Sequence, residues 1–372
     1  MTYYNHINKP IVAFGMLIMN INIVCHTQWI ATIKFNINKT YKIERGIDKM
    51  KALVVKKYGE NAEMVLETRE QPTPKEGEAL VRVHAAALNP LDLTVKSGHL
   101  PFASNPPLVL GNEGAGTVEF SSKFPKGSKV IIQGGMLGVN QDGTHQEMII
   151  VPESQLIPLP KNFSFEEGAA LSVAYSTAYL ALTYSGELKK GEWVAITGAT
   201  GSVGYAALQL AKALGAKPIA IVSSDEKEKQ ASTAQPEAII NLSKEGIVEG
   251  ITRVTSGKGI DVAIDTVGSK GTSLLLHSLA SFGRLVSVGY AAGMETTINL
   301  MDLLSKPAKI IGFSIYAIPE DVTQAAFQHI VQLAEEDKIR PVVDSTFPLE
   351  QWEQAISRLT SRKAIGKIIF TN

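Results

Sequence analysis

Trp193-Val194-Ala195-Ile196-Thr197-Gly198-Ala199-Thr200-Gly201-Ser202-Val203-Gly204 is an apolar, strand-like segment that runs into a glycine-rich turn and then into a helix. Small residues in the turn allow a sharp bend, close approach of the backbone to a pyrophosphate, and tight packing of the next helix. Free N–H groups at the start of that helix attract phosphate. The spacing alone also fits an ordinary tight turn, so only the flanking sequence can distinguish a dinucleotide-binding turn from an ordinary one.

The segments after this turn alternate between helix and strand patterns. An apolar stripe at helical spacing runs from Val203 to Leu214 and ends at Gly215. Short apolar segments then follow at residues 218–222, 238–242, 261–265, 284–289 and 309–313. With the strand at Trp193 they make six strands, as expected of two mononucleotide-binding halves. The pattern predicts an α/β fold with a doubly wound, six-stranded parallel (Rossmann) sheet.

Length and composition limit the possible classes of function. A chain of 372 residues is long for one core, so we expect two domains. The 36 basic residues balance the 36 acidic residues, which favours a small-molecule substrate over nucleic acid or an anionic membrane. The single cysteine, Cys25, excludes a disulfide framework and a four-cysteine zinc lobe within the chain. We therefore expect a reducing, cytoplasmic setting.

Residues 1–49 differ from the rest of the chain and form an atypical N-terminal extension. Asn20 and Asn22 interrupt the apolar stretch 11–25, which is short for a membrane span and lacks a small-residue cleavage site. A well-formed strand pattern begins at Met50, and residues 44–46 can be encoded by a purine-rich tract like a bacterial ribosome-binding site. Our hypothesis is that Met50 is the native start.

Residues 50–159 alternate short strand patterns with Pro/Gly turns, which predicts a largely antiparallel β domain. The strand patterns lie at residues 80–84, 116–120, 129–133 and 147–151. Helix patterns at 321–337 and 349–359, and the strand that closes the chain, are expected to return to this domain. We therefore expect a substrate domain (50–172 and 317–372), a dinucleotide-binding domain (173–316), and a cofactor in the cleft between them.

Several motifs carry a family resemblance over Met50 to Asn372. They are residues 87–92 and 107–116, the nucleotide turn, and residues 265–268, 283–286 and 366–369. The chain resembles the medium-chain dehydrogenase/reductases, which implies that the β domain is GroES-like. Alcohol dehydrogenases of that superfamily hold a catalytic zinc with a cysteine and a histidine at the positions of Asn89 and Asn112. Amides are not usual zinc ligands, so we expect no metal, and the chain resembles the zinc-free quinone oxidoreductase branch.

Two alternatives remain open. Residues 111–114 also resemble mitochondrial-type enoyl-thioester reductases, which carry a tyrosine after the first motif as proton donor. Here that region offers His99 and Phe102, and a lone histidine in such a loop is more often a surface residue. The second alternative is an NADPH-binding regulatory protein without catalytic activity.

The end of the second sheet strand indicates which dinucleotide is bound. NAD-preferring enzymes place an acidic side chain there for the ribose hydroxyls, whereas this chain has Val222 and Ser223. Ser223, Ser224 and Lys227 can instead bind a ribose phosphate. The competing interpretation has Ser224 capping the next helix and Lys227 in solvent. The missing acid favours NADPH over NADH.

Without a metal, the oxyanion that forms on hydride transfer must be met by hydrogen bonds. Quinones and α,β-unsaturated carbonyls spread this charge, so we expect NADPH-dependent reduction of one of them. The resemblance places Asn89 beside the nicotinamide ribose or the substrate, with its amide as donor; otherwise it is a turn residue before Pro90. Asn112 and Glu113 are expected to line the pocket or to pair with backbone. Asp92 is expected to be an architectural acceptor rather than an acid, since an exposed carboxylate is ionised at neutral pH.

Further contacts are expected around the cofactor. The resemblance places Thr177 near the nicotinamide carboxamide, and it implies a homodimer formed through residues 309–313. Loops 96–106 and 136–145 are expected to shape the substrate pocket. The predicted cofactor contacts from the sheet and the turn are Gly198, Ala199, Gly201, Ser202, Val203, Gly204, Val267, Gly268 and Gly289.

Overall fold

The computed structural model describes residues 49–372, which belong to one compact unit. The predicted N-terminal extension, apart from Lys49, lies outside this described part, and so do residues 44–46, on which the Met50 hypothesis partly rests. The strand pattern expected at Met50 is present, in a strand that begins at Lys49. Within residues 49–372, no helix combines the length and the apolar character needed to cross a membrane.

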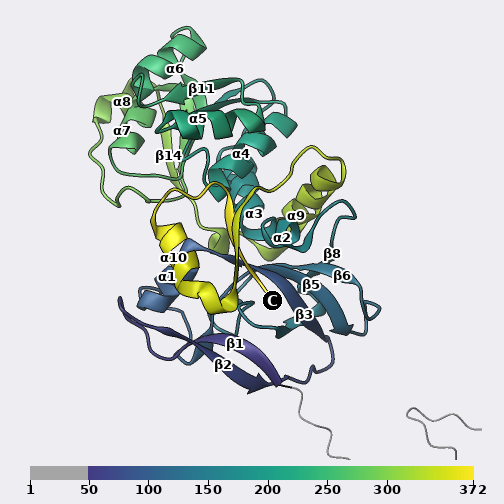
Figure 1. Cartoon of the computed structure of the whole chain (residues 1–372). Helices are drawn as coiled ribbons and strands as arrows, with labels where there is room; N and C mark the ends of the chain where they lie inside the picture. Colours follow the sequence, from purple (N-terminus) through teal and green to yellow (C-terminus); the bar gives the residue numbers. More distant parts are fainter. Residues whose placement is uncertain (1–48) are drawn as a thin grey trace, which may run out of the picture. The chain divides into compact units, whose positions relative to one another are not determined.

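A six-stranded parallel sheet forms one part of the unit and confirms the predicted fold (Figure 1). Its strands lie in the order β11-β10-β9-β12-β13-β14, which is the doubly wound order with the switch point beside β9. Helices α4 to α8 each connect two successive strands of this sheet. The strands are β9 (Trp193–Thr197), β10 (Lys217–Val222), β11 (Ala238–Asn241), β12 (Ile260–Asp265), β13 (Leu279–Ser287) and β14 (Lys309–Gly312). The helices are α4 (Ser202–Ala213), α5 (Asp225–Ala231), α6 (Ile247–Thr255), α7 (Lys270–His277) and α8 (Leu300–Leu304).

The inner strands β9, β10 and β12 are buried on both faces, which explains their continuous apolar sequences. Successive side chains of a strand point to opposite faces. In β9, Val194 and Ile196 belong to one core cluster, whereas Ala195 between them belongs to another. The same alternation holds in β10, where Ala220 lies in the first cluster and Ile219 in the second.

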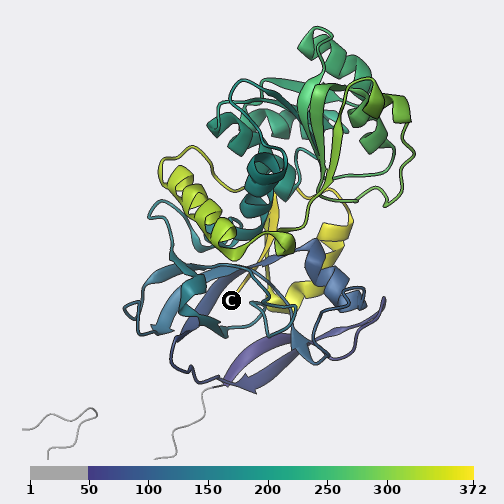
Figure 2. The same ribbon diagram turned by 180° about the vertical axis from the view of Figure 1, so that it is seen from behind.

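Two mainly antiparallel sheets form the β domain, as predicted (Figure 2). The larger sheet has the order β15-β16-β3-β5-β6-β8, with β7 also paired to β3, and its only parallel pair is β15 with β16. The smaller sheet is β2-β1-β4, of which β2 and β4 were not predicted. The strands are β1 (Lys49–Val55), β2 (Met64–Glu70), β3 (Glu78–Leu88), β4 (Leu108–Val109), β5 (Gly114–Phe120), β6 (Lys129–Ile132), β7 (Met148–Pro152), β8 (Leu156–Pro158), β15 (Val343–Pro348) and β16 (Lys367–Thr371).

The remaining helices lie outside the segment of the parallel sheet. They are α1 (Pro90–Ser97), α2 (Phe165–Ala169), α3 (Ser172–Leu180), α9 (Glu320–Glu335) and α10 (Trp352–Thr360). The helix predicted at 321–337 is confirmed as α9, whereas the one predicted at 349–359 is a short 3₁₀ turn followed by α10. Phe327 and Ile330 of α9 are fully buried in the same core cluster as Leu208 of α4. Helix α9 packs on α3, which in turn packs on α4 of the parallel-sheet part.

Candidate active site

The glycine-rich turn has the geometry of a phosphate cradle. Gly198 adopts a left-handed conformation with φ of 58°, and its carbonyl accepts a hydrogen bond from the Gly201 N–H at 2.9 Å. A Cβ added at Gly204 would lie 2.2 Å from the Gly198 oxygen, so only glycine fits there. Gly201 is the N-cap of α4 and caps it without a side chain, which leaves the N–H groups of the first turn for a ligand. These residues fit the pyrophosphate of a dinucleotide.

The buried carboxylate of Asp265 ties the ends of β9 and β12 together. Its Oδ1 accepts from Thr197 Oγ1 at 2.8 Å and from the N–H groups of Val267 and Gly268 at 3.0 Å each. The Val267 carbonyl also accepts from the Ala292 N–H at 2.7 Å. Since both backbone groups of Val267 are already paired, its predicted cofactor contact would come from its half-buried side chain or from the carbonyl's second lone pair.

Close contact between two backbone segments explains why the predicted cofactor contact just after β13, Gly289, is a glycine. The Gly289 N–H donates to the Asp265 carbonyl at 3.1 Å. A Cβ added at Gly289 would lie 2.7 Å from the Thr266 oxygen. The glycine therefore allows the chain after β13 to lie against the end of β12, at the carboxyl edge of the sheet where ligands bind.

The segment after β10 has features of both interpretations made from the sequence, a ribose-phosphate site and a cap of the next helix. Ser224 is the N-cap of α5 and accepts from the Lys227 N–H at 3.4 Å, as the capping alternative expects. Ser223 is exposed and lies next to this cap. The Lys227 ammonium reaches the Arg362 carbonyl, 3.4 Å away in the loop before β16. Lys227 is therefore held beside a second basic residue rather than left in solvent alone.

Two of the three acidic residues of α5, Asp225 and Glu228, are paired with another lysine, whereas Glu226 is exposed. The Lys244 ammonium lies 2.8 Å from Asp225 Oδ1 and 2.7 Å from Glu228 Oε2. Its hydrogen bonds lower the pKa of both carboxyl groups, and Asn241 Nδ2 donates to the same two oxygens. This pairing reduces the effect of their negative charge on the Lys227 side of the helix.

The loop between α10 and β16 lies against the glycine-rich turn, a feature that sequence reasoning missed. The Gly366 N–H donates to the Thr200 carbonyl at 3.0 Å, and Gly366 forms an isolated parallel bridge with Gly201. Gly366 has φ of 83°, and a Cβ there would lie 2.2 Å from the Val342 oxygen. A glycine just before the last strand was the available signal for this close contact.

Four buried polar side chains meet where β16, the start of α1 and the segment before β5 converge. Asn89, Asn112, Glu113 and Lys367 are each at most 4% exposed. Asn89 Nδ2 donates to Asn112 Oδ1 at 2.8 Å and to Glu113 Oε1 at 3.0 Å. The Lys367 ammonium donates to Asn89 Oδ1 at 2.5 Å and forms an ion pair with Glu113 Oε1 at 2.7 Å. We call these four residues the amide cluster.

The hydrogen bonds of the amide cluster assign different roles to its two asparagines. Both amide protons of Asn89 are used within the cluster, so in this arrangement none is left for a substrate oxygen, contrary to our expectation. Asn112 accepts through Oδ1, and its Nδ2 makes no hydrogen bond to any residue that the structure describes. The free amide donor is therefore Asn112. Glu113 Oε2 also accepts from the Val173 N–H at 2.7 Å, which ties the cluster to α3.

Asp92 joins the two motifs and has the predicted architectural role. Its Oδ2 accepts from the Asn89 N–H at 2.7 Å and its Oδ1 from the Gly111 N–H at 3.0 Å. The expectation that it is exposed is wrong, because only 1% of the residue is accessible. Burial raises the pKa of Asp92, although His145 and the two backbone hydrogen bonds oppose the shift.

Comparison with known proteins places these features in a family. Residues 75–161 match the family described as alcohol dehydrogenase GroES-like domain, and residues 202–334 match the family described as zinc-binding dehydrogenase. A quinone oxidoreductase of Sus scrofa is 31% identical over 326 residues, covering 86% of this chain and 97% of the relative. The chain belongs to the medium-chain dehydrogenase/reductase superfamily, in its quinone oxidoreductase branch.

Other members of the superfamily show similar agreement. A synaptic vesicle membrane protein VAT-1 homolog of Danio rerio is 30% identical over 340 residues, covering 86% of this chain and 70% of the relative. The solved structure of an NAD-dependent alcohol dehydrogenase has a TM-score of 0.78 at 28% identity, covering 87% of this chain and 99% of the other. The resemblance found in the sequence motifs is thus confirmed, and the chain is an oxidoreductase of this superfamily.

His99 and Thr177 can also be placed in the structure of this medium-chain dehydrogenase/reductase. His99 is a surface residue, with 66% of its side chain exposed, and it contacts Ser97 Oγ at 3.0 Å. Thr177 is half-buried on α3, one turn beyond Val173. Beside it, the hydroxyl of Ser176 is buried without a hydrogen-bond partner among the described residues. Helix α3 therefore carries polar groups next to the amide cluster.

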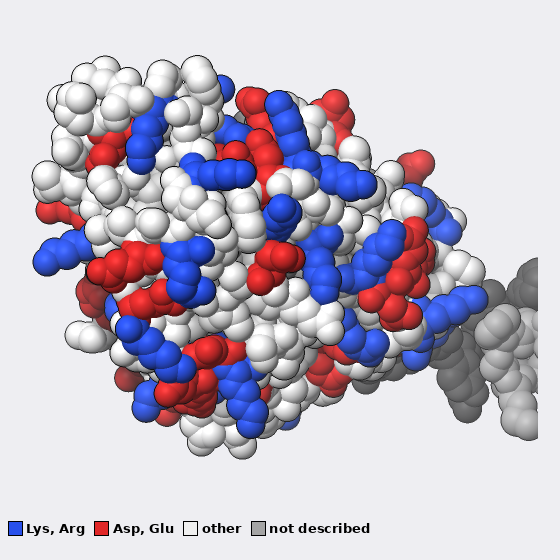
Figure 3. Space-filling model, turned by 90° about the horizontal axis from the view of Figure 1, so that it is seen from above, with Lys and Arg blue, Asp and Glu red and all other residues white. Residues whose placement is uncertain are grey.

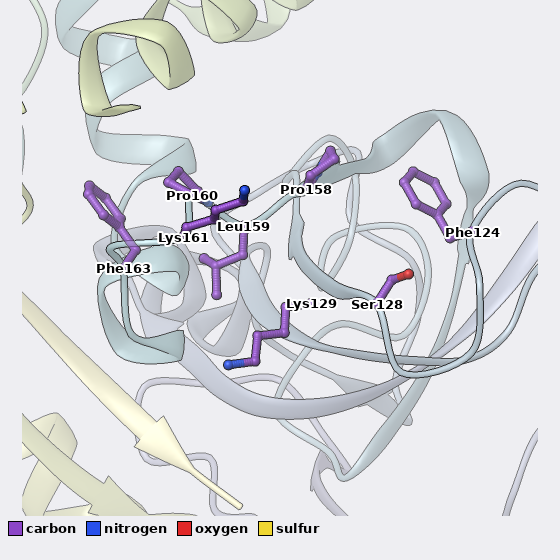
Figure 4. A pocket seen from close by; sticks show the side chains of 8 residues that line it. All are labelled: Phe124, Ser128, Lys129, Pro158, Leu159, Pro160, Lys161 and Phe163. Atoms are coloured by element: carbon purple, nitrogen blue, oxygen red, sulfur yellow. The ribbon is translucent and has the colours of Figure 1, made fainter. Parts of the chain in front are cut away.

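The surface of this medium-chain dehydrogenase/reductase carries mixed charge and a pocket away from the candidate site. On the face in Figure 3, basic and acidic side chains are interspersed, so this face has no large field of one sign. A pocket of about 410 Å³ is lined by Lys129, Lys161 and two phenylalanines, Phe124 and Phe163 (Figure 4). None of its lining residues belongs to the candidate site. Within residues 49–372, no three His, Cys, Asp or Glu side chains are grouped to hold a metal ion.

Proposed function

We propose that the protein is an NADPH-dependent, metal-independent reductase that transfers a hydride to a quinone or an α,β-unsaturated carbonyl. The observation that carries this proposal is the amide cluster, in which Asn112 offers a free amide donor and a buried ammonium binds Asn89. The family resemblance implies that these two asparagines stand where alcohol dehydrogenases carry zinc ligands. The quinone oxidoreductases among the relatives support the substrate class.

The residues of the amide cluster do not fit a zinc ion. Zinc is bound by thiolate, imidazole or carboxylate, whereas the two positions carry the amides of Asn89 and Asn112. Asn89 Oδ1 already accepts from the Lys367 ammonium, whose positive charge repels a cation at this place. The only carboxylate of the cluster, that of Glu113, is paired with the same ammonium.

The dinucleotide site supports a nicotinamide cofactor, and its second strand favours the phosphorylated form. No acidic side chain lies at Val222 or Ser223 to accept hydrogen bonds from ribose hydroxyls. Lys227, together with Ser223, offers a charge and a hydroxyl to a ribose phosphate. Asp225 and Glu228 are paired with Lys244, so these two acids oppose the phosphate less than the sequence alone suggests.

The chemistry requires a donor for the acceptor oxygen. The bound cofactor supplies the hydride, and the acceptor oxygen gains negative charge as its conjugated carbon is reduced. Asn112 Nδ2 donates to that oxygen, and the ion pair of Lys367 with Glu113 keeps the amides oriented. Loss of one such donor costs on the order of 10²- to 10³-fold in kcat. The reduced acceptor then takes the one proton that it needs from water.

The test is acceptor-dependent oxidation of NADPH by the full chain, with quinones, enones and an acyl-chain enoyl thioester as acceptors. Turnover with the first two classes supports the proposal, and Asn112→Leu should reduce kcat about 10²-fold. Turnover with the thioester alone would favour enoyl-thioester reduction. Tight NADPH binding without any turnover would favour the regulatory alternative.

We also propose that the protein is a homodimer formed through β14, the last strand of the parallel sheet. Among the described residues, β14 pairs only with β13, and such an edge strand is a ready template for a second copy of the chain. Large apolar side chains close to it in sequence are exposed, among them Met294 (81%), Leu304 (71%) and Ile310 (42%). Light scattering should give twice the chain mass, and Ile310→Lys should shift it toward the monomer; a monomeric wild type would overturn the proposal.

A further inference from the structure

We propose that Phe102 and Tyr316 form an aromatic wall beside the amide cluster, and that this wall selects planar aromatic acceptors over small aliphatic enones. The inference rests on the proposed function, because it names the class of acceptor that the same site prefers. It is carried by the contact between two exposed rings that come from distant parts of the chain.

The two rings meet edge to face. Their centroids lie 5.9 Å apart, with an angle of 72° between the planes. Phe102 is 51% exposed and Tyr316 is 42% exposed, although large aromatic side chains are usually more deeply buried. In an edge-to-face pair one ring keeps a free face, and a planar ligand can stack on it. The Tyr316 hydroxyl makes no hydrogen bond to any residue within the described part.

Phe102 lies in a loop anchored next to the amide cluster. The Ser104 N–H donates to the Val139 carbonyl at 2.8 Å, which joins this loop to the loop of residues 136–145. Gly138, the neighbour of Val139, lies so close to Gly111 that an added Cβ would be 2.7 Å from the Gly111 nitrogen. Gly111 directly precedes Asn112, the free donor of the cluster.

Tyr316 reaches the same region from the parallel sheet. It lies in the 3₁₀ turn η4 (Ile315–Ala317), just after β14. The Phe313 N–H donates to the Ser287 carbonyl at 3.0 Å, which fixes this segment at the carboxyl edge of the sheet. Burial, and then the nearby charge of Asp92, raise the pKa of Tyr316, so the phenol is neutral at physiological pH. Asp92 is the residue that binds both Asn89 and Gly111.

The pair therefore lies between the carboxyl edge of the dinucleotide sheet and the amide cluster. An acceptor must lie in that interval to receive a hydride at one atom and a hydrogen bond from Asn112 at another. Stacking on an aromatic face favours a fused planar ring such as a naphthoquinone, whereas a small aliphatic enone presents little π-surface.

The experiment compares 1,4-naphthoquinone with 3-buten-2-one as acceptors for the full chain. Phe102→Leu and Tyr316→Leu keep apolar bulk but remove the rings. Each should lower kcat/KM for naphthoquinone about tenfold, mainly through KM, and should leave the value for butenone within about twofold. Tyr316→Phe should behave as wild type because the ring, not the hydroxyl, makes the wall.

Phe120→Leu is the matched control. Phe120 is 56% exposed and ends β5, six residues along the strand from Gly114 and thus about 20 Å from the amide cluster. It should change neither acceptor's kinetics. Binding of naphthoquinone to the NADP⁺-loaded protein, followed by fluorescence quenching, should weaken about tenfold in both ring-to-leucine variants.

Equal losses for both acceptors, no loss for either, or a Tyr316→Phe defect as large as that of Tyr316→Leu would overturn the aromatic wall. Failure of the proposed function looks different, because the wild type would then oxidise no NADPH with either acceptor. In that case the binding measurement still decides about the wall: unchanged naphthoquinone affinity in the leucine variants would overturn it, and weakened affinity would support it.

Discussion

Replacing Lys367 by methionine tests the buried ion pair at the centre of the site. The substitution keeps the length of the side chain but leaves the Glu113 carboxylate, which is 0% exposed, without its countercharge. Breaking a buried pair by removing one partner typically costs about 3–5 kcal/mol of unfolding free energy. Glu113 keeps the hydrogen bonds from Asn89 Nδ2 and the Val173 N–H, so we expect a loss near 3 kcal/mol, the lower end of that range.

The assay is equilibrium urea unfolding of four proteins: wild type, Lys367→Met, Glu113→Gln and the double variant. Because a neutral pair can replace a buried ion pair at little cost, the double variant should lie within about 1 kcal/mol of wild type. Lys51→Met removes the exposed partner of Glu350 and serves as control, with no change in midpoint expected. A loss below about 1 kcal/mol for Lys367→Met, or additive effects in the double variant, would refute this reasoning.

Three further predictions follow from named contacts. Gly204→Ala forces a Cβ against the Gly198 oxygen and should lower the free energy of unfolding in urea by about 1–3 kcal/mol. It should also abolish detectable NADPH binding in a fluorescence titration, and wild-type affinity would contradict the phosphate cradle. Lys227→Ala should weaken NADPH binding about tenfold and leave NADH binding nearly unchanged, whereas equal losses would contradict a phosphate contact. Burial opposes ionisation of Asp344, but hydrogen bonds from Arg358 and the Ile365 N–H outweigh it and lower the pKa of Asp344. The ionised Asp344 therefore stabilises the fold above the ordinary carboxyl pKa of about 4, and this stabilisation is lost as pH falls through the lowered pKa. The difference in unfolding free energy between wild type and Asp344→Asn should shrink below about pH 4. A difference that persists there would show that the assignment is wrong.

The parallel sheet could be predicted in detail because its signals are local. Each strand is a short apolar run followed by a helix pattern, and all six were placed correctly. The ends of elements were predicted less accurately. Strand β13 begins at Leu279, whereas the apolar pattern indicated residue 284, because the exposed Ser281 and Phe282 interrupt that pattern. Helix α1 was missed although Pro90 at its first position and Asp92 two residues later are helix-start signals.

The amide cluster shows what the sequence could not provide. Asn89 and Asn112 were found through motifs, but their partner Lys367 lies 278 residues after Asn89. A lysine in a closing strand has no local signal of burial, since the strand's pairing with β3 is what brings it there. The hydrogen bonds that leave Asn112, rather than Asn89, as the free donor depend on this long-range contact. The contact of Tyr316 with Phe102 is non-local in the same way.

The most direct test of the account is the rate of NADPH oxidation by the full chain with 1,4-naphthoquinone, measured in the presence of EDTA and beside the same assay with NADH. We predict acceptor-dependent turnover that EDTA does not change, with NADPH preferred about tenfold or more. Turnover that disappears with the chelator and returns with zinc, or no turnover above the rate of the protein-free mixture, would contradict it.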